Sequence, residues 1–159
     1  MPKQNLVIFI AGEGGHYEQA KRLLDLLELK NKTNIVFLTD LPNECKMDNI
    51  FHEHLGVIRS KQGFSPFGAL CYFRKAVVTT LHYCLNYNVS IISTGPGISI
   101  LPTLISKLFG AKIIHVETWS RFYSRSLTGK LMYIFSNKFY VQNKSLLSLY
   151  PKAIYSGRL

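Results

Sequence analysis

The sequence predicts an α/β fold in which a Rossmann-like parallel sheet carries helices on both faces. Short apolar runs alternate with segments of helical periodicity along nearly all 159 residues. Two of the apolar runs end in glycine turns that lead into helical segments. Alternation of this kind is typical of a parallel sheet covered on both sides. Because no linker-like tract or internal repeat interrupts the pattern, we expect residues 1–159 to form a single domain.

The first half of the chain contains three expected strands and one expected helix. In chain order, they are a strand over 5–11, a helix over 16–29, a strand over 34–39 and a strand over 55–59. Residues 40–53 are polar, contain Pro42 and show no clear period. We therefore expect a loop with some helix there.

The second half continues the alternation. It contains expected helices over 67–85, 98–109 and 126–135 and expected strands over 89–94, 112–117, 138–141 and 153–155. In the first of these helices a helical spacing relates Leu70, Phe73, Val77, Leu81 and Cys84. This spacing predicts an apolar stripe that faces the core. Ser126 is expected to cap the helix that it begins.

Charge is distributed unevenly along the chain. The formal net charge is +10, and eight of the nine acidic residues lie at or before Glu53. After that point Glu117 is the only acid, against thirteen Lys and Arg. Such a field suits an anionic partner, which leaves a nucleic acid, an acidic membrane surface or a phosphorylated substrate open. No apolar run is long enough to span a bilayer, so we expect any membrane contact to be peripheral.

Three candidate features follow predicted strands. Gly12, Gly14, Gly15 and His16 follow the first strand; Gly95, Pro96 and Gly97 follow a later one; Glu117 ends the next. Ligands of parallel sheets collect at the carboxyl ends of the strands, so these features are expected to converge at one edge. Two glycine turns at helix N-termini would suit a diphosphate. The turns match neither a P-loop nor a dinucleotide fingerprint.

Two side chains at this edge can carry chemistry. His16 is a candidate general base toward a substrate hydroxyl, with a helix-cap or packing role as the alternative. Glu117 is a candidate for binding sugar hydroxyls or assisting proton transfer, with an ion pair to Arg121 as the alternative. The three cysteines, Cys45, Cys71 and Cys84, form no metal or disulfide pattern. No acidic metal motif is present either, so neither a metal nor a cofactor is expected.

Aromatic and basic residues meet at the start of the helix expected over 67–85. Phe64, Phe67, Tyr72, Arg74 and Lys75 form a face of the kind that lies in the headgroups of an anionic membrane. The alternative is that the apolar side chains of this helix belong to the core while its two cations are solvated. The sequence leaves both interpretations open.

An ordered set of motifs runs through the chain. It consists of Gly12-Glu13-Gly14-Gly15-His16, Thr94-Gly95-Pro96-Gly97, His115-Val116-Glu117, Ser126-Leu127-Thr128-Gly129-Lys130 and the final stretch 151–159. This set resembles the membrane-associated subunit of the two-part N-acetylglucosaminyltransferase of dolichol-linked oligosaccharide synthesis. It is more similar still to the PssD/CpsF-type bacterial relatives of that subunit in capsule and exopolysaccharide synthesis. The resemblance implies the N-terminal half of a GT-B glycosyltransferase, similar to the acceptor-binding domain of MurG.

The resemblance also implies roles and partners. His16 and Glu117 become candidate catalytic groups, and the two glycine loops with Arg121, Ser126 and Lys130 become candidate substrate contacts. The implied partners are a polyprenyl-diphosphate-linked sugar acceptor, a UDP-sugar-binding catalytic subunit and an anionic membrane surface. The catalytic subunit is expected to contact Tyr155, Gly157, Arg158 and Leu159. The chain would act on the inner face of the cytoplasmic membrane as a peripheral protein, without the transmembrane anchor of its eukaryotic relatives.

Two rival functions remain open from the residues. One is a structural adaptor that docks the catalytic subunit on the membrane and contributes no active-site group. The other is a nucleic-acid-binding module, which the positive charge suggests. A nucleic-acid partner is not expected, because the glycine turns and the strand-end carboxylate would have no purpose in such a module.

Overall fold

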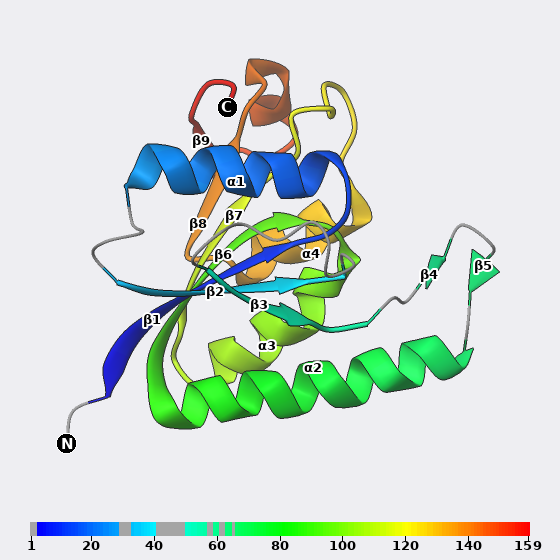
Figure 1. The fold of residues 1–159 in the computed structure, drawn as a ribbon. Helices are drawn as coiled ribbons and strands as arrows, with labels where there is room; N and C mark the ends of the chain where they lie inside the picture. Colours follow the sequence, from blue (N-terminus) through cyan, green and yellow to red (C-terminus); the bar gives the residue numbers. More distant parts are fainter. Residues whose placement is uncertain (1–2, 29–32, 41–49, 57–58, 61–62, 65) are drawn as a thin grey trace.

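The computed structural model describes residues 3–28, 33–40, 50–56, 59–60, 63–64 and 66–159. Seven parallel strands form the main sheet, in the order β3-β2-β1-β6-β7-β8-β9 (Figure 1). They are β1 (Gln4–Ala11), β2 (Asn34–Thr39), β3 (Phe51–His54), β6 (Tyr87–Gly95), β7 (Lys112–Val116), β8 (Lys138–Val141) and β9 (Ile154–Tyr155). The expected parallel α/β fold is confirmed.

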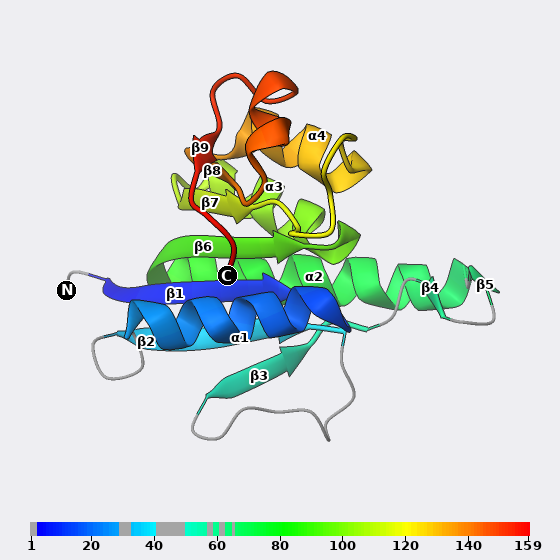
Figure 2. The ribbon, with the colours of Figure 1, turned by 90° about the horizontal axis from the view of Figure 1, so that it is seen from above.

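Helices cover both faces of this sheet. They are α1 (Gly15–Leu27), α2 (Pro66–Asn86), α3 (Ile100–Leu108) and α4 (Leu127–Phe135), with short 3-10 helices at Gly97–Ser99 and Lys144–Ser148. Helix α1 lies on one face, whereas α2, α3 and α4 pack on the other (Figure 2). A small antiparallel pair, β4 (Arg59–Ser60) and β5 (Gly63–Phe64), lies beyond the sheet near the start of α2.

The two hydrophobic cores follow from the alternation along the central strand β1. Leu6, Ile8 and Ile10 point into the larger core with residues of α2 and α4. Phe9 and Ala11 point to the opposite face, into the smaller core beneath α1. Because both faces are covered, the strand reads as a continuous apolar run rather than an alternating one.

The third strand differs from the prediction. It occupies Phe51–His54, which overlaps the end of the stretch 40–53 expected to be a loop. Of the expected strand 55–59, residues 55 and 56 belong to no strand, and residues 57–58, like 41–49 of the expected loop, lie outside the described residues. This edge strand pairs with β2 through its backbone, and Phe51 is exposed at the surface. Its backbone hydrogen bonds are made with the neighbouring strand, so a largely polar sequence can form this strand. The hydrophobic periodicity of the sequence therefore does not predict it.

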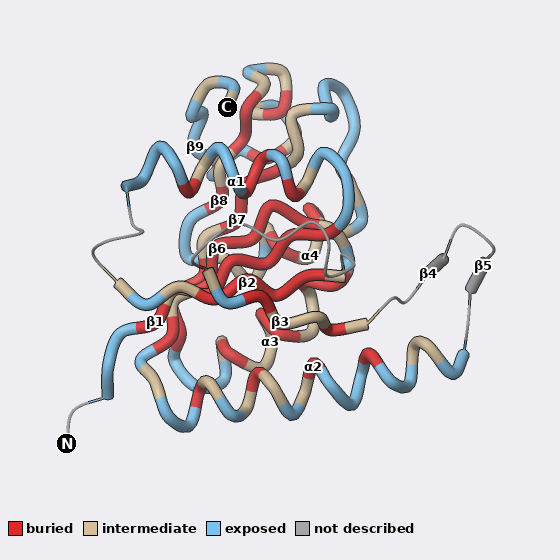
Figure 3. Tube along the Cα trace, in the orientation of Figure 1, coloured by how far each residue is buried: buried red, intermediate tan, exposed pale blue. Residues whose placement is uncertain are grey.

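Helix α2 has the expected extent, but the apolar stripe expected in the core is buried only in part. Tyr72, Ala76, Thr80 and Cys84 are buried, whereas Leu70 and Phe73 are 66% and 55% exposed. The buried and exposed positions alternate along the tube in Figure 3. The hydroxyl of Tyr72 donates a hydrogen bond to the carbonyl of Ile98 at 2.8 Å. The expected membrane contact of Tyr72 is therefore wrong, because this side chain belongs to the core.

Candidate functional site

A cavity of about 280 Å³ opens at the carboxyl ends of β6 and β7. Residues from four segments line it: His16, Thr94, Gly95, Pro96, His115, Glu117, Thr118, Ser120, Arg121, Ser126, Leu127 and Thr128. The segments are the start of α1, the end of β6, the end of β7 with its following loop, and the start of α4. The three sequence features expected to converge at one sheet edge do so here.

His16 is held in one orientation by the backbone of β6. Its Nδ1 lies 2.6 Å from the carbonyl oxygen of Thr94, and Thr94 Oγ1 donates to the carbonyl of His16 at 2.8 Å. A carbonyl oxygen can only accept, so Nδ1 carries the proton in this contact. The neutral ring therefore presents the lone pair of Nε2 as an acceptor.

Gly95 allows the imidazole of His16 to lie against β6. Its φ is +86°, in the left-handed region that favours glycine. A Cβ at this position would also lie 3.0 Å from His16 Cε1 and 3.1 Å from Nδ1. Gly95 thus makes room for the His16 ring. The sequence had suggested only that this glycine turn could bind a phosphate.

Glu117 is almost fully enclosed, with 2% of its surface exposed. Its carboxylate accepts hydrogen bonds from the backbone N–H of Thr118, the hydroxyl of Ser126 and the hydroxyl of Tyr150, at 3.0–3.1 Å. The alternative ion pair with Arg121 is not formed; the Arg121 guanidinium instead donates to Ser124. Burial and the negative charge of Glu117 raise the pKa of the Tyr150 phenol, which stays a donor.

The start of α4 is fitted around this carboxylate. Ser126 caps the helix as expected, since its Oγ accepts from the N–H of Gly129 at 2.7 Å. A Cβ at Gly129 would overlap Glu117 Oε2 and crowd Tyr150 and Ser126. The carboxylate therefore lies directly at a helix N-terminus, where the positive end of the helix dipole stabilises a negative charge.

Two further residues of this edge were not among the predicted site residues. His115 lines the cavity, is buried, and contacts Ser93 Oγ through Nδ1 at 3.3 Å. Burial and the nearby His16 lower the pKa of His115 to about 3, so this ring is neutral at pH 7. Asp40 accepts a hydrogen bond from the N–H of Glu13 at 3.0 Å and so fixes the first glycine turn. Asp40 directly follows β2, and this position at the carboxyl end of a strand could have identified it from the sequence.

The predicted site residues divide into two groups. His16, Gly95, Pro96, Glu117, Arg121 and Ser126 line the cavity. Gly12, Gly14, Gly15, Gly97 and Lys130 are not part of its lining. Gly12 lies behind it, closely approached by the Pro96 ring and by Asp40. Gly12 thus supports the second glycine turn from behind, and His16 is the residue of the first turn that reaches the cavity.

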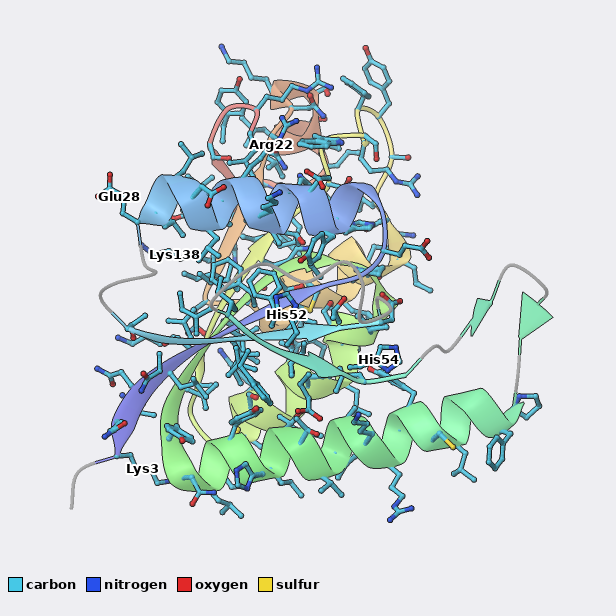
Figure 4. All side chains as sticks on the ribbon, viewed as in Figure 1. Lys3, Arg22, Glu28, His52, His54 and Lys138 are labelled. Carbon is cyan, nitrogen blue, oxygen red and sulfur yellow. The ribbon has the colours of Figure 1, made fainter. Side chains whose placement is uncertain are left out.

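The C-terminal residues expected at a subunit interface lie over α1 and the loop that follows β7. The N–H of Leu159 donates to Gln142 Oε1 at 3.0 Å, and the Arg158 guanidinium lies 5.8 Å from the Phe122 ring centroid. Arg22 reaches from α1 toward this end of the molecule (Figure 4), with its guanidinium 5.1 Å from the Trp119 ring centroid. Tyr155 and Arg158 remain exposed at the surface.

Membrane and metal features can be stated for the described part of the chain. Phe67, Arg74 and Lys75 are exposed on α2, while the side chain of Phe64 lies outside the described residues. None of the helices that the structure describes is long and apolar enough to cross a bilayer. No cluster of three or more His, Cys, Asp or Glu there is arranged to hold a metal ion.

Comparison with known proteins identifies the fold and the family of this chain. The structure matches the crystal structure of Acinetobacter baumannii MurG with a TM-score of 0.63 at 16% identity. The match covers 98% of this chain but 44% of MurG, as expected for one half of a GT-B fold. Relatives from several organisms are named UDP-N-acetylglucosamine transferase subunit ALG14. The Kluyveromyces lactis protein is 29% identical and covers 98% of this chain and 79% of its own length. The human protein is 26% identical, with 99% and 85% covered.

A family model described as "Oligosaccharide biosynthesis protein Alg14 like" matches residues 7–159. The match spans the glycine turns, the strand-end glutamate and the C-terminal segment. None of these findings names a capsule or an exopolysaccharide, so that part of the expectation stays a prediction. The chain belongs to the Alg14-like family of oligosaccharide biosynthesis proteins.

Proposed function

We propose that this chain is the acceptor-binding half of a two-subunit UDP-sugar glycosyltransferase. It binds a polyprenyl-diphosphate-linked sugar at the cytoplasmic membrane face and recruits a UDP-sugar-binding catalytic subunit. The orientation of His16 carries the proposal, because its Nδ1 is bonded to Thr94 and its Nε2 lone pair is left to accept a proton at the cavity. The family membership and the MurG-like fold support the same assignment.

The reaction assigned to the pair is a sugar transfer. Nε2 of His16 accepts the proton of an acceptor hydroxyl as its oxygen attacks the anomeric carbon of the UDP-sugar, and UDP departs with the bonding electrons. The donor is held by the second subunit, so the bond forms between the two chains. Neither a metal nor a cofactor is required of this chain for that step.

Glu117 has a narrower role than the sequence suggested. Three donors of the chain itself, from Thr118, Ser126 and Tyr150, occupy its carboxylate. We therefore assign Glu117 to positioning Ser126 and the loop after β7, rather than to proton transfer. Arg121 is exposed at the rim of the same cavity and supplies a positive charge for the diphosphate.

Helix α2 is the proposed membrane contact. Its sequence contains no acidic residue, and its outer face exposes large apolar side chains. Phe67, Leu70, Val78 and Leu85 are 77%, 66%, 61% and 59% exposed. Arg74 is exposed beside them, while Lys75 lies 3.5 Å from Glu53 and is partly neutralised. A basic, apolar helix face of this kind lies in the headgroup region of an anionic bilayer.

The C-terminal end is the proposed contact for the catalytic subunit. Tyr155 and Arg158 are exposed there, and Gly157 and Leu159 are half-buried. Lys144 lies 5.5 Å from the Tyr155 ring centroid, so aromatic and positively charged groups alternate on this surface. An acidic, aromatic-rich surface on the partner would complement it.

Reconstitution tests the half-enzyme proposal. The purified chain is mixed with UDP-N-acetylglucosamine and a short polyprenyl-diphosphate N-acetylglucosamine, with and without the purified catalytic subunit. We expect transfer only when both chains are present, because neither half alone surrounds both substrates. Transfer by this chain alone at a normal enzymatic rate would overturn the proposal.

The structural-adaptor alternative makes a different prediction for the cavity. A double variant, His16→Ala with Glu117→Gln, is co-purified with the catalytic subunit and assayed. An adaptor would retain its activity as long as assembly is intact. Loss of transfer in an intact pair would exclude the adaptor.

A further inference from the structure

Three side chains that follow β8 hold the loop that rims the cavity. Gln142 Nε2 donates to the carbonyl of Glu117 at 3.0 Å. Asn143 Nδ2 donates to the carbonyls of Trp119, at 2.9 Å, and of Arg121. Ser145 Oγ donates to the carbonyl of Phe122. We call these three residues the 142–145 clamp, because their side chains fasten four carbonyls of residues 117–122.

Asn143 departs from the usual behaviour of its residue type. It occupies the N-cap position of the 3-10 helix Lys144–Ser148, yet its side chain makes no capping hydrogen bond. Its amide is committed to two carbonyls that lie 22 and 24 residues earlier in the chain. The sequence distance shows that this asparagine serves the loop rather than its own helix.

The clamped loop has no regular secondary structure of its own. Residues 120–125 are exposed and form no regular helix or strand. Within the loop, Arg121 N–H donates to the carbonyl of Thr118 at 3.2 Å, and the Arg121 side chain donates to Ser124. Two guanidinium–ring contacts also reach the loop from outside, that of Arg22 with Trp119 and that of Arg158 with Phe122. An exposed segment without a regular helix or strand depends on its backbone hydrogen bonds for a single conformation. The clamp supplies most of the bonds that reach outside the loop.

Gln142 connects the same loop to the C-terminal end of the chain. It is buried, and while its Nε2 donates to Glu117, its Oε1 accepts from the N–H of Leu159. One amide therefore joins the end of β7, at the cavity, to the segment proposed to meet the catalytic subunit. The Gln142 side chain therefore contacts both the cavity edge and the C-terminal segment.

We infer that Asn143, together with Gln142 and Ser145, positions the cavity-rim loop for acceptor binding. Thr118, Ser120 and Arg121 of this loop line the cavity, so a loop released from the clamp would misplace these three side chains. The catalytic consequence rests on the proposed function, whereas the effect on the loop does not. Asn143 is thus a positioning residue, which acts through the loop and touches no substrate.

The single tryptophan of the chain, Trp119, reports on this loop. The test compares wild type with Asn143→Asp, which keeps the shape but replaces two N–H donors by an acceptor facing two carbonyls. Limited trypsin cleavage after Arg121 and Arg125 and acrylamide quenching of Trp119 are measured on the full chain. Losing these two hydrogen bonds, one part-buried and one exposed, should raise the open population, and with it the cleavage rate, roughly 5- to 30-fold.

The matched control is Asn88→Asp, which removes an exposed side-chain contact with Asn5 at the opposite end of the sheet. It should leave cleavage and quenching unchanged. Ser145→Ala, which loses one clamp bond without adding charge, provides a milder variant if Asn143→Asp does not fold. In the reconstituted pair, the same variants should raise KM for the acceptor and leave KM for the UDP-sugar unchanged.

The loop measurements need no substrate, so they remain decisive if the proposed transfer reaction proves wrong. Faster cleavage and stronger quenching in Asn143→Asp and Ser145→Ala, but not in Asn88→Asp, establish the clamp. Cleavage and quenching equal to wild type in both clamp variants would overturn it. Altered loop readouts with unchanged acceptor KM would overturn the positioning role in binding.

Discussion

The cavity edge and helix α2 handle polar and apolar groups in opposite ways. At the cavity, Glu117 and His115 are buried charged or titratable side chains, each surrounded by hydrogen-bond donors or rings of the chain. On α2, large apolar side chains such as Phe67 and Leu70 face outward, while the small polar Thr80 is buried. The first region is fixed by internal contacts, and the second leaves surface for something outside the chain.

The largest expected effect is the contribution of His115 to the pH dependence of the free energy of unfolding. Its pKa is lowered from 6.5 to about 3 by burial, so between these values the unfolded chain binds a proton that the folded chain does not. The free energy of unfolding should therefore fall as pH drops from about 6.5 toward 3, by an amount on the order of a few kcal/mol. Urea unfolding of wild type and His115→Asn at pH 7 and pH 4.5 measures this.

We expect the pH dependence to shrink in His115→Asn and to persist in His82→Asn, which alters an exposed histidine of α2. Equal pH dependence in wild type and His115→Asn would mean that this ring is not held neutral in the folded chain.

Next in size is the effect of a methyl group at the start of α4. Gly129→Ala places a Cβ against Glu117 Oε2, Tyr150 and Ser126. Overpacking of a fitted site typically costs about 1–3 kcal/mol, and we expect a loss of unfolding free energy in that range. Gly97 provides the control, because its φ is not positive and a Cβ there would meet open space. Gly97→Ala should therefore be nearly neutral in denaturant unfolding, and an equal loss in both variants would contradict the fitted site.

A smaller effect is expected at Tyr72, where the two regions meet. Tyr72→Phe removes the hydroxyl that donates to Ile98 and leaves the ring in the core. The unfolding free energy should fall by about 0.5–1.5 kcal/mol, the net contribution of one intramolecular hydrogen bond. Vesicle binding should not change. Weaker binding to anionic vesicles without a loss of stability would restore Tyr72 as a membrane contact.

The smallest effect on stability belongs to the outer face of α2. Phe67→Ser and Leu70→Ser remove exposed side chains, so the unfolding free energy should stay within about 0.5 kcal/mol of wild type. Binding to vesicles of phosphatidylglycerol and phosphatidylcholine should nevertheless weaken, as shown by co-sedimentation. Leu26→Ser, on the exposed surface of α1, is the control and should bind as wild type does. Unchanged binding of all three variants would remove α2 from the membrane proposal.

The sequence predicted the cavity edge better than the helix face. Gly95 and Glu117 stand at the ends of apolar strands, and parallel topology alone brings such ends together. On α2 the first two residues of the predicted stripe, Leu70 and Phe73, are exposed, whereas Cys84 at its other end is buried, so the rule that assigns apolar stripes to the core holds only in part. Helical spacing alone cannot distinguish an apolar face that packs in the core from one that lies at the protein surface.

The contacts within the site were beyond sequence reasoning for a related reason. The bonds from Asn143 to Trp119 and from Tyr150 to Glu117 join residues more than twenty positions apart. No local pattern marks them, because they depend on how β7, β8 and α4 are placed side by side. The strand Phe51–His54 was missed likewise, since its pairing comes from β2 and not from its own composition.

The central claim is that His16 accepts the proton of the acceptor hydroxyl. Its most direct measurement is kcat/KM of the reconstituted pair with His16→Ala, with His82→Ala as the matched control. Removing a general base should lower kcat/KM by roughly 10²- to 10⁴-fold, while subunit assembly and vesicle binding stay as in wild type. His82→Ala should transfer sugar at the wild-type rate. Turnover of His16→Ala within a few-fold of wild type would contradict the claim.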